Sequence, residues 1–357
     1  MDSNTNIRKE TKNKIRVDYE GKLSFKERMK NKLKASNTWI TAIVNFFRFM
    51  LMLGVSFVIL YPFFARIAGS FMTREDVIDS TVALIPKNFT VDIYKYIILE
   101  NGYFEAMFNT ALLSLISALI QTLVACLIGY GLAKFKFKGN KLVMLAVVLS
   151  MVIPHATLKM SFIEHFKAFD IFTVSSWNYT GPIEFIGGLF TDEPFQLNLL
   201  NSFWPMVILS VFGLAFKNGL YIYLMRQFFK GVPDELEESA YVDGSGTFRT
   251  FFKIILPLSV PMMITIFLFS FSWQWTDKFY TDLFFIEGDP SKMHLLPDIY
   301  KSWPPSIEPP QGAAGTALYQ NVFQNTAGLM IIAPLVIVYL FCQRYLVQGI
   351  ERSGLVG

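Results

Sequence analysis

Six stretches of this 357-residue chain are apolar and long enough to cross a membrane as helices, and they constrain its fold more than any other feature. A helix of about 20 residues crosses the hydrocarbon layer and hydrogen-bonds its own backbone there. The composition agrees, because 53% of the residues are hydrophobic and only 17% are charged. We therefore expect an all-α polytopic membrane protein. Its six transmembrane helices are expected near residues 46–71, 108–133, 141–162, 203–226, 254–275 and 327–346.

Positive charges lie mainly on one side of these segments. Eleven Lys and Arg fall in residues 1–40, four in the 134–141 loop, four in the 226–253 loop and two near the C-terminus. The other three loops are much longer and hold only seven; they are residues 72–107, 163–202 and 276–326. Loops rich in Lys and Arg stay in the cytoplasm. Both termini and the 226–253 loop are therefore expected to be cytoplasmic.

This pattern divides the chain into three parts. Residues 1–45 form a basic cytoplasmic tail, residues 46–349 the six-helix transmembrane domain, and residues 350–357 a short cytoplasmic tail. Apolar residues beside lysines in the first tail, such as Phe25 and Met29, fit a basic amphipathic helix on anionic membrane lipid. Its polar composition fits disorder equally well.

The 226–253 loop reads as two short helices joined by a glycine turn. Pro233 followed by acidic residues is a helix start, because proline tolerates the first turn and carboxylates oppose the helix dipole. Gly244 and Gly246 then break the helix. Residues 247–255 return to helical spacing, with one apolar and one basic face. Such a pair of helices docks into a partner protein or rests on the membrane surface, and spacing alone leaves both possibilities open.

The same loop carries a motif at fixed spacing. Its residues are Glu238, Ala240, Asp243, Gly244, Ile254, Leu256 and Pro257. In these residues the loop resembles the signature loop of ATP-binding-cassette (ABC) importer permeases, which reads Glu-Ala-Ala, two residues, Asp-Gly-Ala, eight residues and Ile-x-Leu-Pro. Ser239 and Ser245 replace two of the alanines, and both changes exchange one small residue for another.

Further stretches resemble the carbohydrate-uptake branch of these permeases, specifically the maltose-type second permease. They are residues 224–229, which lead into Pro233, and residues 343–349. The resemblance covers about residues 46–357 and implies a type I ABC importer permease fold in a bacterial plasma membrane. It implies three partners, namely a second permease subunit, a pair of ABC ATPase subunits and an extracytoplasmic sugar-binding protein. No nucleic acid is expected as a partner.

The resemblance also implies roles for the residues of the loop. The helices of residues 233–253 would sit in a groove of the ATPase and couple ATP hydrolysis there to alternating access. Glu238 would meet polar groups of the ATPase, the small residues would allow close approach, Gly244 would form the turn, and Pro257 would end the loop. The expected coupling residues are Glu238, Ser239, Ala240, Asp243, Gly244, Leu256 and Pro257.

Sequence motifs for catalysis are absent from the chain. It contains no Gly-x-x-x-x-Gly-Lys-Ser/Thr phosphate-binding loop, so ATP and magnesium are expected on the partner ATPase, with no cofactor on this chain. The three histidines lack metal-ligand spacing, so neither a metal site nor a catalytic site is expected. His155 follows Pro154 within the third segment and is interpreted as part of a helix kink with its polar group satisfied.

The transported molecule is expected to be a di- or oligosaccharide. The six segments contain almost no carboxylates, which ion-coupled carriers place in the membrane. Lys217 and Asn218 lie inside the fourth segment, where a charge should face water or protein, and Tyr221 and Tyr223 can stack on a sugar. These four residues are the candidates for lining the pathway. Lys217 would suit an anionic sugar, or it would pair with a polar group of a neighbouring subunit.

A second class of function remains open. A secondary carrier or channel without an ATPase would explain the six spans, but the match to the signature motif would then be a coincidence. A membrane-embedded enzyme is a third and less favoured interpretation. The aromatic outer loop, with Trp177 and Tyr179, fits sugar faces but also fits the membrane interface. Co-purification separates the first two classes, because a carrier runs alone.

Overall fold

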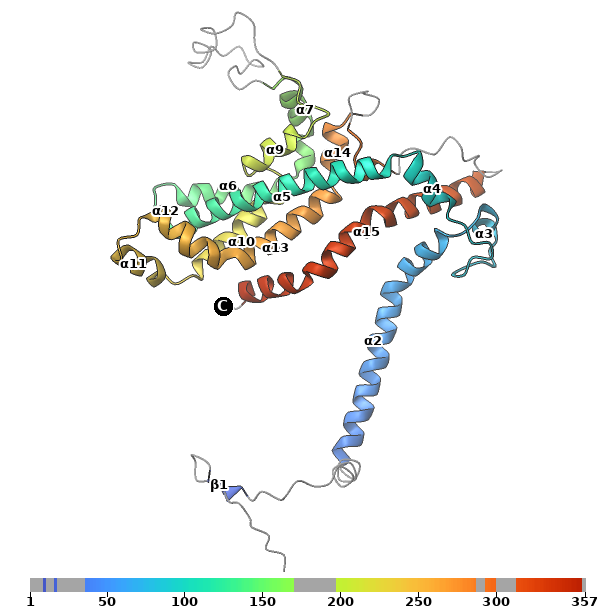
Figure 1. Cartoon of the computed structure of the whole chain (residues 1–357), viewed down its shortest axis with the longest axis horizontal. Coiled ribbons are helices and arrows are strands. Elements are labelled where there is room, and N and C mark those ends of the chain that lie inside the picture. Colours follow the sequence, from blue (N-terminus) through green and yellow to red (C-terminus); the bar gives the residue numbers. More distant parts are fainter. Residues whose placement is uncertain are drawn as a thin grey trace, which may run out of the picture. The chain divides into compact units, whose positions relative to one another are not determined.

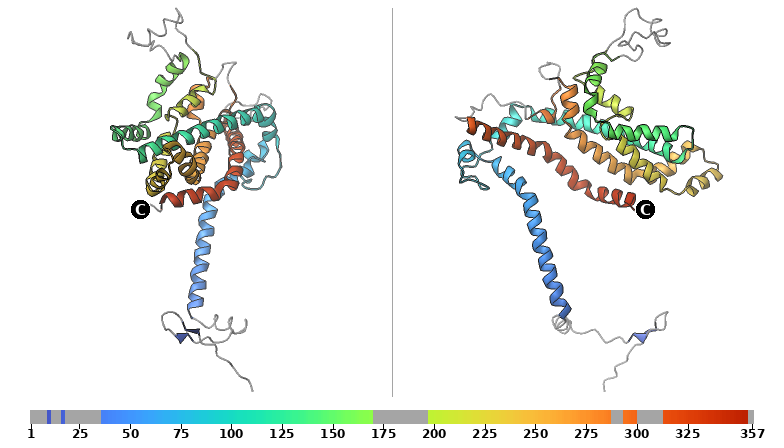
Figure 2. Two further views of the ribbon diagram at one scale, coloured as in Figure 1. Left: turned by 60° about the vertical axis from the view of Figure 1, so that its left-hand side comes forward. Right: turned by 180° about the vertical axis from the view of Figure 1, so that it is seen from behind.

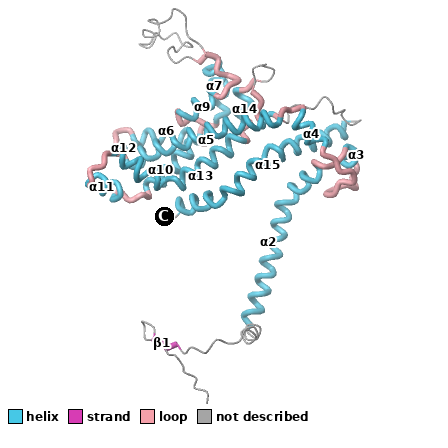
Figure 3. The backbone as a smooth tube through the Cα atoms, in the orientation of Figure 1, coloured by secondary structure: helices cyan, strands magenta, loops and turns pink. Residues whose placement is uncertain are grey.

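The structure is a computed structural model of the whole chain, and it describes residues 9–10, 16–17, 36–169, 197–286, 293–299 and 313–354. Most of these residues are helical (Figure 1 and Figure 3). The chain divides into two compact units, Met1–Ala65 and Arg66–Gly357. Most of the N-terminal tail, the loop around Trp177 and Tyr179 and the last three residues lie outside the described residues.

The first unit holds two very short strands and most of one long helix. Strand β1 (Lys9–Glu10) pairs antiparallel with β2 (Arg16–Val17). Helix α2 (Ser36–Gly69) is apolar over Ile40–Gly69, and its side chains from residue 40 to residue 64 are all exposed. A helix that is apolar all round suits lipid or other transmembrane helices as its surroundings.

The second unit contains the remaining helices. In chain order they are α3 (Arg74–Ile78), α4 (Asp92–Leu99), α5 (Tyr103–Lys134), α6 (Asn140–Val152), η1 (His155–Leu158), α7 (Lys159–Lys167), α9 (Trp204–Val211), α10 (Asn218–Lys230), α11 (Glu235–Val242), α12 (Thr247–Thr250), η2 (Phe251–Ile255), α13 (Leu256–Trp275), α14 (Phe279–Phe284), η3 (Leu296–Asp298) and α15 (Ala313–Gly354).

Helix α5 is central to this unit and packs against α10 and α13 (Figure 2). It contains no proline, and most residues of its buried face are small or polar, which lets neighbouring helices approach and hydrogen-bond. Gln121 Nε2 donates to Ser210 Oγ on α9 at 3.1 Å, and Ser270 Oγ on α13 donates to Gln121 Oε1 at 2.7 Å. A Cβ atom on Gly129 would lie 2.6 Å from Cβ of Met225, so α5 and α10 are in contact at this glycine.

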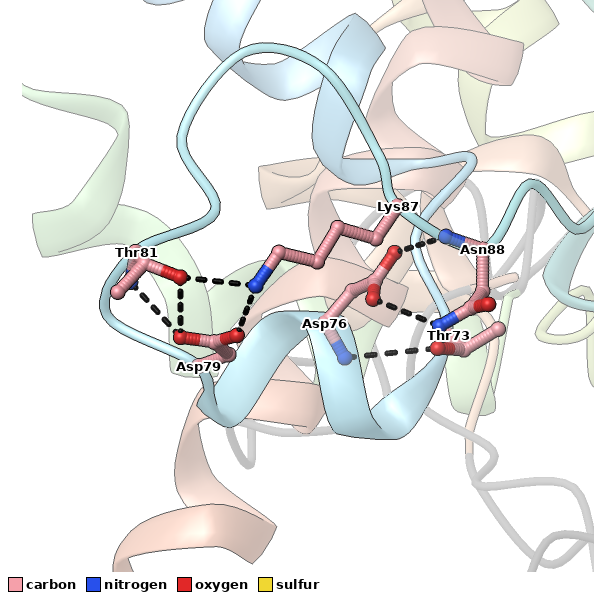
Figure 4. A network of polar contacts seen from close by, with 6 residues as sticks. All are labelled: Thr73, Asp76, Asp79, Thr81, Lys87 and Asn88. Carbon is pink, nitrogen blue, oxygen red and sulfur yellow. Dashed lines mark hydrogen bonds and ion pairs between the residues drawn. The ribbon is translucent and has the colours of Figure 1, made fainter.

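The connection before α4 is held by two small polar networks (Figure 4). The buried carboxylate of Asp76 accepts hydrogen bonds from the backbone and side-chain nitrogens of Asn88, at 2.8 and 3.1 Å. Thr73 caps the first turn of α3. Asp79 accepts hydrogen bonds from the Lys87 side chain and from the side chain and backbone of Thr81, and these hydrogen bonds lower the pKa of Asp79. The segment is therefore ordered although it contains little regular structure.

The structure agrees with some of the six predicted membrane spans. Among the residues that the structure describes, four helices are long and apolar enough to cross a membrane; they are Ile40–Gly69, Tyr103–Lys134, Thr247–Trp275 and Ala317–Tyr345. The third predicted segment forms α6 and then η1 and α7, bent by 92°, and counting it as one span gives five. The described helices do not reach the expected count of six spans: the third segment bends where a kink was predicted, and the fourth, expected as one span, divides into α9 and α10.

Local chemistry explains both interruptions. Pro154 lacks a backbone N–H and has an extended conformation, so α6 ends before it. Between α9 and α10, Gly213 and Lys217 adopt positive φ angles of 72° and 66°, which no helix accommodates. The His155 prediction of a kink with a satisfied polar group was confirmed, because its Nδ1 and the Tyr280 hydroxyl form a hydrogen bond.

Candidate functional site

The predicted 226–253 loop connects α10 to α13, and we call it the inner loop because its positive charges predict that it faces the cytoplasm. It forms a helix, a glycine turn and a second helix. Helix α11 follows Pro233 and carries acidic residues in its first turn. Gly244 has a φ angle of 78°, and the Ser245 N–H donates to the Ala240 carbonyl at 2.9 Å, so the turn closes tightly after α11. Any other residue at Gly244 would be strained by this backbone conformation.

The second helix of the loop differs from expectation at its far end. Helix α12 continues through the single π turn η2 into α13, giving one helix from Thr247 to Trp275. Pro257 therefore does not end the loop as predicted. It lies within the continuous helix, and the π turn just before it accommodates the hydrogen bond that proline cannot make.

The expected coupling residues are mostly accessible. Glu238, Ser239, Asp243 and Gly244 are exposed on α11 and its turn, and Pro257 is exposed on α13. Ala240 is buried against the rest of the loop, and Leu256 packs against the cluster of buried apolar residues formed by α5, α10 and α13.

Apolar side chains also point outward from this loop. Val242 is 87% exposed and Phe248 is 81% exposed, and Leu236, Tyr241 and Phe252 lie on the same two helices with more than a third of their surface accessible. We call these five residues the apolar tip. An exposed group of this kind on an otherwise polar loop is typical of a surface that another protein covers.

A buried ion-pair network anchors α11 to the end of α5. The Lys134 side chain is only 7% exposed, pairs with Asp234 and donates to the Val232 carbonyl at 2.6 Å. Its Nζ also lies 3.9 Å from Glu237 Oε1, and the Tyr130 hydroxyl donates to Glu237 Oε2 at 3.4 Å. Burial raises the pKa of Glu237, whereas the hydrogen bond from Lys134 lowers that of Asp234.

Sequence reasoning missed this anchor. The sequence identified Lys134 only as the end of the second apolar segment and as one of the positive charges of its loop, and the acidic residues chosen were Glu238 and Asp243, which are exposed. The available signal was the lysine that closes a long apolar helix, followed 100 residues later by an aspartate and then a glutamate at helical spacing.

A second group of functional side chains lies where three helices are interrupted. His155 follows the break between α6 and η1, Phe216 and Lys217 lie in the break before α10, and Trp273 and Tyr280 flank the break between α13 and α14. The rings of His155 and Phe216 are 5.5 Å apart, and Lys217 Nζ lies 4.9 Å from the Phe216 ring and 5.0 Å from the Trp273 ring. We call these five residues the break cluster.

The four predicted pathway residues do not share one surface. Lys217 is half-buried in the break cluster, whereas Asn218 and Tyr221 are fully buried in the helix bundle, and Tyr223 is exposed on a different face of α10. Neither polar side-chain atom of Asn218, nor the Tyr221 hydroxyl, has a hydrogen-bond partner among the described residues. The structure thus combines Lys217 with Trp273 and His155, which the sequence did not link to it.

Comparison with known proteins identifies the family. Residues 121–352, which contain both groups of residues described above, match the family described as binding-protein-dependent transport system inner membrane component. The chain belongs to this family. It is therefore an inner membrane component of a transport system, and its family is one of transport permeases and not of enzymes.

Individual relatives agree along most of the chain. It is 24% identical over 314 residues to the polygalacturonan/rhamnogalacturonan transport system permease protein YtcP of Bacillus subtilis (strain 168), covering 87% of this chain and 96% of that protein. It is 30% identical over 285 residues to the alpha-glucoside transport system permease protein AglG of Rhizobium meliloti (strain 1021), covering 77% of this chain and 62% of that protein.

A solved structure supports the fold. The crystal structure of a bacterial ABC transporter involved in the import of the acidic polysaccharide alginate contains a chain that superposes with a TM-score of 0.61 and 20% sequence identity. The match covers 87% of this chain and 98% of that one. The helical fold is therefore that of an ABC importer permease.

Proposed function

We propose that this chain is a permease subunit of an ATP-driven importer of a di- or oligosaccharide, with ATP and magnesium bound by a separate ABC ATPase. The observation that carries the proposal is the apolar tip on the inner loop, which projects from two helices that are each fixed to the transmembrane bundle. A surface that must be covered by a partner, on a rigid connection to the membrane helices, is what energy coupling between subunits requires.

Two separate connections would carry movement from the loop into the membrane. Lys134 ties α11 to the end of α5, so displacement of α11 pulls on that helix. Helix α12 continues into α13 without a break, so displacement of α12 moves α13 directly. Closure of the ATPase around ATP would then drive both helices between inward-open and outward-open arrangements.

Within the loop, each expected residue then has a physical role. Glu238 and Asp243 offer carboxylates to polar or basic groups of the ATPase. The side chain of Ser239 is small, so the ATPase can approach the helix closely at this position. Ala240 packs inward, and Gly244 permits the turn that presents Val242 and Phe248 to the partner. Leu256 and Pro257 belong to the helix that receives the movement.

The carbohydrate substrate is supported by the relatives, whose names specify transport of polygalacturonan/rhamnogalacturonan, alpha-glucosides and arabinooligosaccharides. The proposed partners are a second permease, a pair of ABC ATPase subunits and an extracytoplasmic sugar-binding protein. The last is supported by the alginate transporter, whose structure was solved in complex with a periplasmic protein carrying an alginate pentasaccharide. Membrane lipid or the second permease would surround the exposed side chains of α2.

The proposed topology places both termini and the apolar tip in the cytoplasm, as the positive charges indicate. In cells expressing a variant without Cys126 and Cys342, an impermeant thiol reagent should label a cysteine at Ile85, which is 82% exposed in the connection before α4. It should not label a cysteine at Phe137, in the turn between α5 and α6, until the membrane is opened. The reverse pattern would overturn the topology.

Purification of the chain from its native membrane tests the proposal as a whole. A permease of this kind should bring a second permease and an ATPase, and reconstituted uptake of oligosaccharide should require ATP and survive collapse of the proton gradient. A chain that purified alone, with uptake that stopped when the gradient collapsed while ATP stayed high, would be a secondary carrier instead.

A further inference from the structure

The break cluster has an ammonium group that finds no acidic partner in the described part of the chain. Among the described residues, Lys217 Nζ makes no ion pair and no hydrogen bond, and its contacts are the faces of Phe216 and Trp273. An ammonium group has three N–H donors. The two aromatic faces attract its charge and hold it in place, but they do not accept its hydrogen bonds as a carboxylate would. The lysine is therefore positioned by its neighbours but left with hydrogen bonds to give.

The backbone around Lys217 adds to the positive potential. Lys217 is the N-cap of α10, a helix of 13 residues, and the N-terminal end of a helix carries partial positive charge and unpaired N–H groups. The next residue, Asn218, is completely buried, and neither its amide oxygen nor its amide nitrogen has a partner among the described residues. Its Nδ2 lies 3.5 Å from where a Cβ on Gly213 would be, within the same break.

Other members of the break cluster supply a surface for a sugar ring. Trp273 is 49% exposed although it is large and apolar. His155 bonds to the Tyr280 hydroxyl through Nδ1, and its Nε2 has no partner in the described part of the chain. An aromatic face beside a polar ring nitrogen suits the apolar face and the hydroxyl groups of a pyranose.

Asp277, the acidic residue in the helix breaks that form the cluster, does not neutralise the charge of Lys217. Asp277 follows the last residue of the span that ends at Trp275, and its Oδ1 accepts hydrogen bonds from the N–H groups of Phe279 and Tyr280 at 3.1 and 3.4 Å. Burial raises the pKa of Asp277 to about 7, so ionisation of this carboxyl group is less favourable than for an exposed aspartate.

From these observations we infer that the break cluster binds a sugar that carries a carboxylate, so that the transported molecule is an acidic oligosaccharide. Lys217 pairs with the sugar carboxylate, the exposed part of the Trp273 ring stacks on the sugar face, and His155 Nε2 hydrogen-bonds a hydroxyl. The inference rests on the proposed function, because it names the substrate class of the same transporter. It assigns to this chain a binding site that neither the family nor the fold specifies.

Uptake by the complete transporter in proteoliposomes tests the inference. The probes are trigalacturonate and trimannuronate, each compared with its methyl ester, which keeps the sugar and removes the charge, and maltotriose as a neutral sugar. We expect ATP-dependent uptake of at least one acidic trisaccharide. The Lys217→Met variant should raise the KM for that sugar by about 10- to 100-fold, the effect of one charged hydrogen bond, while Lys217→Arg should retain most of the uptake.

Matched variants and a second measurement separate binding from folding. Lys95→Met removes an exposed positive charge on α4 and should change nothing, and Trp273→Phe should weaken binding of charged and esterified sugar alike. Each variant complex must purify with the same subunits. Saturation-transfer NMR of trigalacturonate or trimannuronate with the complex, without the sugar-binding protein, should show contact that Lys217→Met abolishes.

Two results would overturn the inference while leaving the proposed function intact. One is ATP-dependent uptake of maltotriose or the methyl esters alone by the wild-type complex. The other is a Lys217→Met complex that loses charged and esterified substrates equally or fails to assemble, which would mean that the lysine pairs with a carboxylate of the second permease. ATP-independent uptake of every sugar would instead count against the proposed function.

Discussion

Lys134 is the residue on which the inner loop most depends. Its ammonium group is nearly inaccessible to water, and three oxygen atoms from the start of α11 surround it. Removing one member of a buried ion pair leaves the other charge without compensation, which is more damaging than removing both. A single substitution at Lys134 should therefore disturb the packing of the inner loop while the helix bundle stays folded.

Replacement of Lys134 by Met should destabilise the purified complex by about 2–4 kcal/mol and reduce substrate-stimulated ATP hydrolysis, because Glu237 is left buried without its partner. The double variant Lys134→Met/Glu237→Gln should recover part of that loss. Lys138→Met, an exposed lysine in the turn that follows, is the control and should behave as wild type. Thermal unfolding and ATP hydrolysis of the three complexes provide the measurement, and equal effects at Lys134 and Lys138 would contradict the anchor.

Motif spacing located the inner loop but not the residues that hold it. Glu238 and Gly244 are identified by their places in the motif, and they are exposed, because a surface that meets a partner leaves its side chains unpaired within the chain. Glu237 and Lys134 are 103 residues apart, and only the packing of α11 against α5 brings them together. No local pattern in one sequence records such a pair.

At the scale of helices, hydropathy gave the number of apolar segments but not their continuity. The α5 and α13 segments are single helices, as predicted, since their sequences carry a uniform apolar run. The third and fourth segments carry equally apolar sequences yet break, at Pro154 and between Gly213 and Lys217. A hydropathy average over a window of residues changes little with one proline or one glycine. Hydropathy alone therefore did not reveal the breaks or the cluster of side chains that lies at them.

Contact between α5 and α10 provides a test at this scale. Gly129→Ala would place a methyl group 2.6 Å from Met225 Cβ and 3.0 Å from the Arg226 nitrogen, so the helices must separate, at a cost of about 1–3 kcal/mol. Gly131→Ala, two residues along the same helix, meets nothing within 4 Å. The first variant should lower the unfolding temperature of the purified complex and the second should not. A similar decrease in both would indicate that helix contact is not the reason.

For the whole molecule, the described helices of the unit Arg66–Gly357 form a bundle built on α5, and the two candidate functional regions share elements of this bundle. The break cluster takes Trp273 from the end of α13, and two residues of the apolar tip, Phe248 and Phe252, lie near the beginning of the same continuous helix. A rigid helix of 29 residues therefore joins the region proposed to meet the ATPase to the region proposed to meet the sugar. This continuity is the physical basis for coupling in the present account.

The most direct test is ATP-driven sugar uptake by proteoliposomes that contain the complete transporter with Val242→Asp/Phe248→Asp in this chain. Phe137→Asp, an exposed apolar residue in the other inner turn, is the control. If the apolar tip transmits the work of the ATPase, the double variant should assemble with the second permease, lose the ATPase and lose at least about nine-tenths of uptake, while the control retains it. Uptake by the double variant equal to that of the control would contradict the account.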